Sequence, residues 1–145
     1  MRNSRTTAIS CLAVLCALYM VGAVSHGVLR HVVQTLPLWF PIVWGFRDNE
    51  LAKWAALPCL VFWLAIVGMI WLFLLGWAHL VSGHFSPTEI AMTIVIAVGS
   101  VAGLITICRW RTAIPPLPAG AAVLLFAVLQ LMAFRISLLP SIAHR

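Results

Sequence analysis

Residues 55–80, AALPCLVFWLAIVGMIWLFLLGWAHL, decide the fold class, because this stretch contains no Lys, Arg, Asp or Glu. About 20 predominantly apolar residues in a helix are enough to cross the hydrocarbon core of a bilayer. The stretch therefore predicts a membrane-spanning helix. It is apolar on all sides, so its periodicity does not show which face packs against protein.

The composition of the whole chain supports the same conclusion. Of the 145 residues, 63% are hydrophobic and 8% are charged, whereas about a quarter of the residues of a soluble domain are charged. A soluble fold of this size keeps too much surface exposed to hide such a composition. We therefore expect an all-α, polytopic integral membrane protein, with residues 1–145 forming a single membrane domain.

Three further apolar stretches complete a predicted bundle of four transmembrane helices, at residues 8–25, 55–80, 87–108 and 119–139. The first stretch also fits a cleavable signal peptide, because Ala23 and Ser25 are small residues at a suitable spacing. Its apolar run is long for a signal core, which favours a retained helix. The loop at 109–118 contains three prolines and is predicted to be non-helical.

Two local motifs mark the third span. Ser86, Pro87 and Glu89 have the spacing of a helix N-cap, first turn and capping box. Gly99 and Gly103 form a G-x-x-x-G motif, which predicts close contact with another helix. In the fourth span, Gln130 is expected to hydrogen-bond to a neighbouring helix.

Residues 26–54 are predicted to be an amphipathic, interfacial segment between the first two spans. Residues 27–36 have apolar and polar faces at helical spacing, and Pro37 is expected to end that helix. Residues 38–46 are too short to span the bilayer and contain Pro41 and Gly45. Trp39 and Trp44 favour the headgroup region, and Asp48 or Asn49 is a candidate N-cap for the next helix.

The charges predict two conflicting orientations. With four spans, one side of the membrane would hold Arg30, Arg47, Lys53, Arg109 and Arg111, and the other Arg2, Arg5, Arg135 and Arg145. The total count favours cytoplasmic loops after the first and third helices. Arg2 and Arg5 beside the first helix favour a cytoplasmic N-terminus instead.

The main candidate binding site is the polar stripe of the amphipathic segment, extended by two residues beyond it. Its members are His26, Arg30, His31, Gln34 and Thr35, followed by Trp39 and Arg47. Facing the bundle, these groups would suit an anionic lipid headgroup, a small ligand or a partner subunit. Facing water, they would be the solvated side of an interfacial helix.

Catalytic and metal-binding chemistry is not supported by the sequence. Three acidic residues leave few groups for a catalytic site, and the four cysteines form no C-x-x-C pair. In a four-span chain, His26 and His31 would lie on the opposite side from His79 and His84, so they would not share one haem or metal. We expect no catalytic residues, metal, cofactor or nucleic-acid partner.

These observations favour a non-enzymatic accessory subunit or helper of a membrane complex, packing through its third span. The alternatives are a small oligomeric transporter or channel, and a redox subunit binding haem or quinone. The chain is similar in size and charge balance to small four-span dimeric transporters, but it lacks their intramembrane Glu. Its partners would be the bilayer and a membrane protein or a second copy, and short loops favour a bacterial inner membrane.

Overall fold

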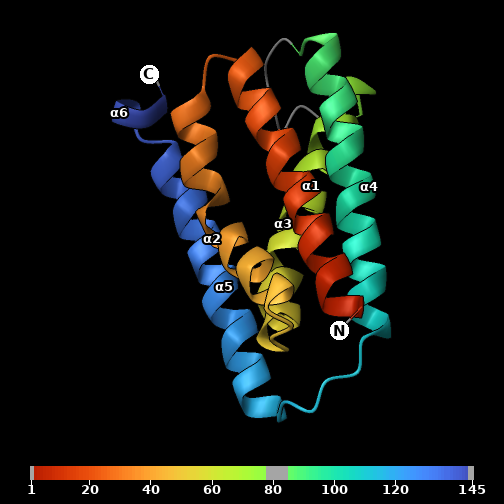
Figure 1. Ribbon diagram of the computed structural model, residues 1–145. Coiled ribbons are helices and arrows are strands. Elements are labelled where there is room, and N and C mark those ends of the chain that lie inside the picture. The colour runs from red at the N-terminus through yellow and green to blue at the C-terminus, as the bar shows by residue number, and fades with distance from the viewer. Residues whose placement is uncertain (1, 78–84, 144–145) are drawn as a thin grey trace.

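The computed structural model describes residues 2–77 and 85–143, and every regular element in those ranges is helical (Figure 1). The helices are α1 (Arg2–Val24), α2 (Val28–Phe46), α3 (Leu51–Leu74), α4 (Pro87–Arg109), α5 (Pro116–Ser137) and the short α6 (Pro140–Ala143).

Four of the helices are long and apolar enough to cross a membrane: Asn3–Val24, Leu51–Leu74, Pro87–Arg109 and Pro116–Ser137. They correspond to the four predicted spans. The last begins at Pro116, inside the stretch expected to be a loop. Prolines in the first turn of a helix cost little, because the N–H groups there have no intrahelical acceptor.

The capping box at the start of α4 is present as predicted. The Ser86 hydroxyl accepts a hydrogen bond from the Glu89 N–H at 3.3 Å, and the Glu89 carboxylate accepts one from the Ser86 N–H at 2.7 Å. At the start of α3, the Asn49 side chain accepts a hydrogen bond from the Leu51 N–H at 2.9 Å. The N-cap residue of the helix is Glu50, between the two.

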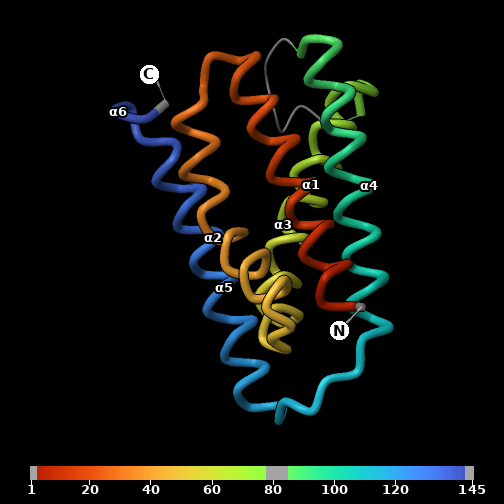
Figure 2. The backbone as a smooth tube through the Cα atoms, viewed as in Figure 1, coloured from red at the N-terminus to blue at the C-terminus, as the bar shows by residue number. Residues whose placement is uncertain are grey.

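The expectation that Pro37 ends the amphipathic helix is wrong. α2 continues through both Pro37 and Pro41 for 19 residues, and it bends about halfway along (Figure 2), as proline-containing helices do. Both prolines are buried against neighbouring helices. Side chains also bond to the α2 backbone, since the Thr35 hydroxyl donates to the His31 carbonyl at 2.9 Å. Burial against neighbouring helices is what makes proline tolerable inside a packed helix.

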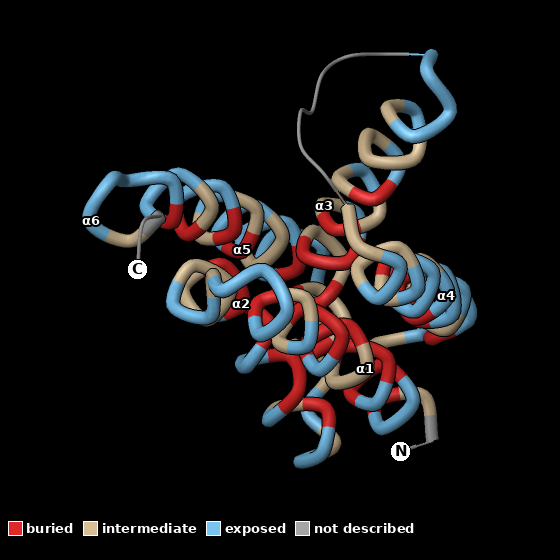
Figure 3. The backbone as a smooth tube through the Cα atoms, turned by 90° about the horizontal axis from the view of Figure 1, so that it is seen from above, coloured by how far each residue is buried: buried red, intermediate tan, exposed pale blue. Residues whose placement is uncertain are grey.

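The interfacial placement of this segment is also not observed, because α2 lies between α1 and α5 and runs antiparallel to both (Figures 1 and 3). Beside α1, His31 packs near Gly22, at the end of α1, while Gly45 packs near Ser4, at its start. At 1.5 Å per residue, α2 is about 28 Å long. It is therefore nearly as long as the apolar helices around it.

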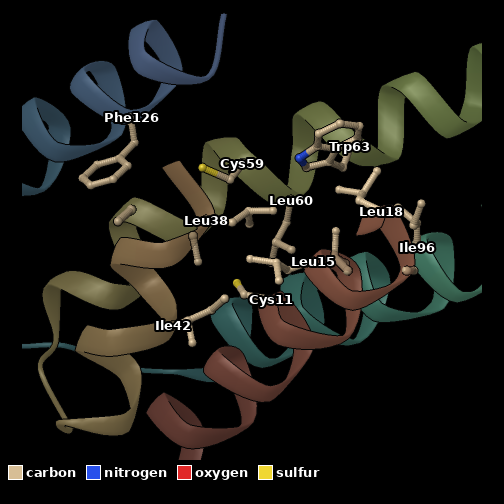
Figure 4. Close-up of a cluster of buried hydrophobic side chains, with 14 of the residues drawn as sticks. Cys11, Leu15, Leu18, Leu38, Ile42, Cys59, Leu60, Trp63, Ile96 and Phe126 are labelled. Carbon is tan, nitrogen blue, oxygen red and sulfur yellow. The ribbon is translucent and has the colours of Figure 1, made fainter. Parts of the chain in front are cut away.

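α3 lies inside an arc formed by α5, α2, α1 and α4, and it contacts all four (Figure 3). α4 and α5 stand at the two ends of this arc, and their described residues do not contact each other. The apolar core fills the arc around α3, where Leu60, Cys59 and Trp63 meet Leu38 and Cys11 (Figure 4).

The alternating directions of the five long helices gather most cations at one end of the molecule, which we call the basic end. It contains the start of α1, the α2–α3 turn and the α4–α5 linker, with Arg2, Arg5, Arg47, Lys53, Arg109 and Arg111. Arg30 and Arg135 lie at the opposite, far end. The predicted grouping of Arg30 with Arg47 is therefore wrong. The N- and C-termini lie at opposite ends (Figure 1).

Candidate functional site

The polar stripe of α2 divides between two helix interfaces. Positions 31 and 35 face α1, where an added Cβ on Gly22 would lie 3.0 Å from His31 Nδ1. The same nitrogen lies 2.9 Å from the Gly27 carbonyl oxygen. Position 34 faces α5 instead. The stripe is therefore neither a wholly solvated face nor one continuous binding surface.

Gln34 takes part in a buried hydrogen-bonded cluster between α2 and α5. Its Nε2 donates to the Ser137 hydroxyl at 2.9 Å, and its backbone carbonyl accepts from Gln130 Nε2 at 3.0 Å. The prediction that Gln130 bonds to another helix is thus confirmed. Gln130 Oε1 is buried without a partner among the described residues. The cluster joins two helices and leaves one acceptor unused.

Tyr19 connects two members of the stripe to α1. Its hydroxyl lies 3.3 Å from the Thr35 hydroxyl and accepts from Trp39 Nε1 at 3.4 Å. The Trp39 side chain is 44% exposed, so its ring also contributes to the outer surface. Tyr19 was not predicted, because a lone tyrosine in an apolar helix carries no signal of its partner.

Arg30 is half-buried one turn before Gln34, and its Nε is buried without an acceptor among the described residues. His26, by contrast, is exposed in the α1–α2 turn, where its φ is 55°. It borders a depression of about 440 Å³ together with Phe85, Ser86 and Glu89. Arg47 follows α2 at the basic end and does not belong to this group. The structure thus places Arg30 one turn before Gln34, turns His31 toward α1 and separates Arg47 from all three.

Polar contacts hold three chain segments together at the basic end. Asp48 in the α2–α3 turn accepts a hydrogen bond from the Ser4 hydroxyl at 2.6 Å and forms an ion pair with Arg5 at 3.2 Å. The Ser4 hydrogen bond, and secondarily Arg5, lowers the pKa of Asp48 below its ordinary value. The α4–α5 linker is bound to α3, because Lys53 Nζ donates to the Trp110 carbonyl and Glu50 accepts the Ala113 N–H at 2.9 Å.

Gly99 and Gly103 lie against α1 and α3 within the same chain. An added Cβ on Gly99 would be 3.2 Å from Val14 Cγ2, and one on Gly103 would be 2.6 Å from Leu60 Cδ1 and 3.1 Å from Ser10 Cβ. This face of α4 is occupied internally. A partner that packs through the same glycines would have to displace α1.

The described part of the chain contains no group of three or more His, Cys, Asp or Glu residues arranged to hold a metal ion. His79 and His84, which were weighed as a second histidine pair, lie outside the described residues. The polar groups around α2 are amides, hydroxyls, an imidazole and one guanidinium.

No protein-family model, curated protein or solved structure matches this chain.

Proposed function

We propose that this protein is a polytopic component of a bacterial cytoplasmic membrane, in which α2 crosses the bilayer together with the four apolar helices. The length of α2, about 28 Å, is close to the thickness of the hydrocarbon core. Its polar groups at Gln34 and Thr35 are buried against α5 and α1. Polar side chains that face the protein interior are the kind a spanning helix tolerates.

The distribution of charge supports one orientation for this five-helix arrangement. Six cationic positions lie at the basic end, and two described ones, Arg30 and Arg135, lie at the far end. Loops rich in Lys and Arg remain in the cytoplasm. The conflict between the first helix and the loops disappears, because five crossings place Arg2 and Arg5 on the same side as Arg109 and Arg111. The N-terminus would be cytoplasmic and the C-terminus would be outside.

Reporter fusions test this topology directly. Green fluorescent protein, which fluoresces in the cytoplasm, and alkaline phosphatase, which is active outside it, are fused separately to each terminus of the full chain. We expect fluorescence from the N-terminal fusion and phosphatase activity from the C-terminal fusion. Both termini on one side would contradict five crossings, and an external N-terminus would contradict the orientation.

Within the membrane, we propose a non-enzymatic role as an accessory subunit of a larger complex. The observation that carries this proposal is the outward face of α2, which is apolar and aromatic, with exposed Leu36, Trp39, Phe40 and Val43. Arg30 lies near the start of the same helix and is half-buried, and Trp and Arg are common anchors at protein interfaces.

The test is affinity isolation from the native membrane in a mild detergent, with the intact mass of the complex recorded. We expect a stoichiometric membrane partner that is lost from Arg30→Gln and kept by Arg135→Gln. Arg135 is the matched control, because it is an exposed cation at the same far end. Equal partner recovery from both variants would contradict a role for Arg30.

A homo-oligomer without foreign subunits would contradict the accessory role and favour the transporter alternative. Solute flux into vesicles containing only this protein separates the two functions. A helper alone should transport nothing.

A further inference from the structure

A cleft of about 950 Å³ lies at the basic end, lined by the end of α4, the α4–α5 linker, the first turn of α3 and one side of α5. The described residues of α4 and α5 do not contact each other, although both helices contact α3 (Figure 3). The α4–α5 linker connects the two helices at this end (Figure 1).

The entrance of the cleft is cationic and aromatic. Lys53, Trp54, Trp110 and Arg111 line it. Lys53 Nζ lies 4.6 Å from the centre of the Trp54 ring and also donates to the Trp110 carbonyl, so the ammonium is held at the entrance with donors to spare. Arg111 is exposed. The nearby Glu50 carboxylate accepts the Ala113 N–H, and its single negative charge leaves the two cations, Lys53 and Arg111, in excess.

The side of the cleft formed by α5 is apolar. Gly120, Val123, Leu124 and Ala127 line it at positions i, i+3, i+4 and i+7, which form one stripe along a helix. No other side chain lies within 4 Å of a Cβ added to Gly120. A free inorganic anion would use the entrance alone and leave this stripe without a partner.

We propose that the cleft binds one anionic glycerophospholipid, with its phosphate between Lys53 and Arg111 and an acyl chain along the Gly120–Ala127 stripe. The cleft matches such a lipid in both its parts. Its cations attract the anionic headgroup, and its tryptophans are of the kind common at the headgroup boundary. The apolar wall suits an acyl chain. This inference rests on the proposed membrane location. With the basic end in the cytoplasm, the lipid comes from the cytoplasmic leaflet.

The test uses the full-length protein in nanodiscs of equal parts phosphatidylglycerol and phosphatidylcholine, followed by release and native mass spectrometry. We expect one retained phosphatidylglycerol per chain. Arg111→Gln should lower its retention about fivefold, because one cation near an anionic headgroup contributes that much to binding. Arg47→Gln is the matched control, since Arg47 is exposed at the same end but does not line the cleft.

A second pair of variants tests the acyl-chain part of the site. Gly120→Phe fills the cleft and should reduce lipid retention, whereas Ala121→Phe adds the same ring to an exposed neighbour that does not line it. Equal retention of the two lipids by the unmodified protein would overturn the proposal. So would equal effects of Arg111→Gln and Arg47→Gln. An effect of Arg111→Gln without one of Gly120→Phe would show that only the headgroup is bound and reject the acyl-chain part of the proposal.

Separate readouts distinguish failure of this inference from failure of the proposed function. Loss of the lipid peak concerns the cleft alone. A chain recovered from the soluble fraction of cells would refute the membrane location, and a missing partner mass would refute the accessory role.

Discussion

The interfaces of α1 and the interface between α2 and α5 are built in opposite ways. α1 meets its neighbours through small residues: a Cβ on Gly45 of α2 would lie 2.8 Å from the Ser4 carbonyl oxygen and from Ala8 Cβ. α2 and α5 instead meet through amides and rings, with Gln34 bonded to Ser137 and the Phe40 and Phe126 rings 5.6 Å apart.

The difference shows two solutions to the same physical problem. Between helices in lipid, the hydrophobic effect favours no particular neighbour, because lipid tails are as apolar as Leu. Specific association then needs either close backbone approach, which increases dispersion contacts, or hydrogen bonds that lipid does not offer. α1 relies on the first where Gly45, Gly99 and Gly103 meet it, with hydrogen bonds through Tyr19 in its later half. The α2–α5 pair uses the second. The two kinds of interface should respond differently to substitution.

The largest effect is expected for Gly45→Ala. The added methyl would overlap backbone of α1 at Ser4, and overpacking of this kind costs about 1–3 kcal/mol. The midpoint of unfolding in detergent, followed by tryptophan fluorescence, should fall. Gly68→Ala is the control, because nothing lies within 4 Å of its added Cβ, and it should raise stability through higher helix propensity. Equal destabilisation by both would refute close packing at Gly45.

A smaller effect is expected for Gln34→Leu, which removes the hydrogen bond to Ser137. Hydrogen bonds between membrane helices contribute about 0.6–2 kcal/mol. Gln130→Leu should cost less, because it also removes Oε1, which is buried without a partner among the described atoms. Unfolding midpoints of the two variants measure this order. A larger loss for Gln130→Leu would mean that Oε1 has an acceptor role in the native protein.

The smallest effect is expected at the basic end, where Asp48 is solvent-facing. Its pKa is lowered in the folded protein by the Ser4 hydrogen bond and by Arg5. The stabilisation is therefore fully present above the unfolded pKa, about 3.9, and is lost as the pH falls through the lower folded value. Asp48→Asn should melt below the unmodified protein at neutral pH, and the difference should disappear in acid. A difference that persists below the folded pKa would exclude the ionised carboxylate as its source.

Much of the fold follows from local sequence. The four apolar helices were predicted because each stretch is long and apolar enough to cross a membrane. The start of α4 was predicted because Ser86, Pro87 and Glu89 provide a local cap for the first backbone groups of the helix. The candidate site was predicted less well. Gln34 was singled out, but its partner Ser137 lies 103 residues away in sequence, and no periodic pattern connects two such positions.

The continuation of α2 through Pro37 shows why. Proline has no backbone N–H to donate within a helix, so the local sequence predicts that the helix ends there. In the folded protein Pro37 is buried beside helices that support α2 along its length. The balance between breaking and continuing the helix depends on contacts with α1 and α5, which are absent from the local sequence.

The amino-acid sequence by itself determined that the chain has four helices long and apolar enough to cross a membrane, where they lie and where α4 begins, because each depends on composition or on neighbours within a few residues. Only the tertiary structure decided that α2 is a fifth long helix, that the cations of α1 and of the loops gather at one end, and that α3, α4, α5 and the α4–α5 linker line a cleft there. These features depend on pairings between distant segments. Inside a helix, a polar group or a proline is tolerated only where a neighbouring helix packs against it or supplies a hydrogen-bond partner.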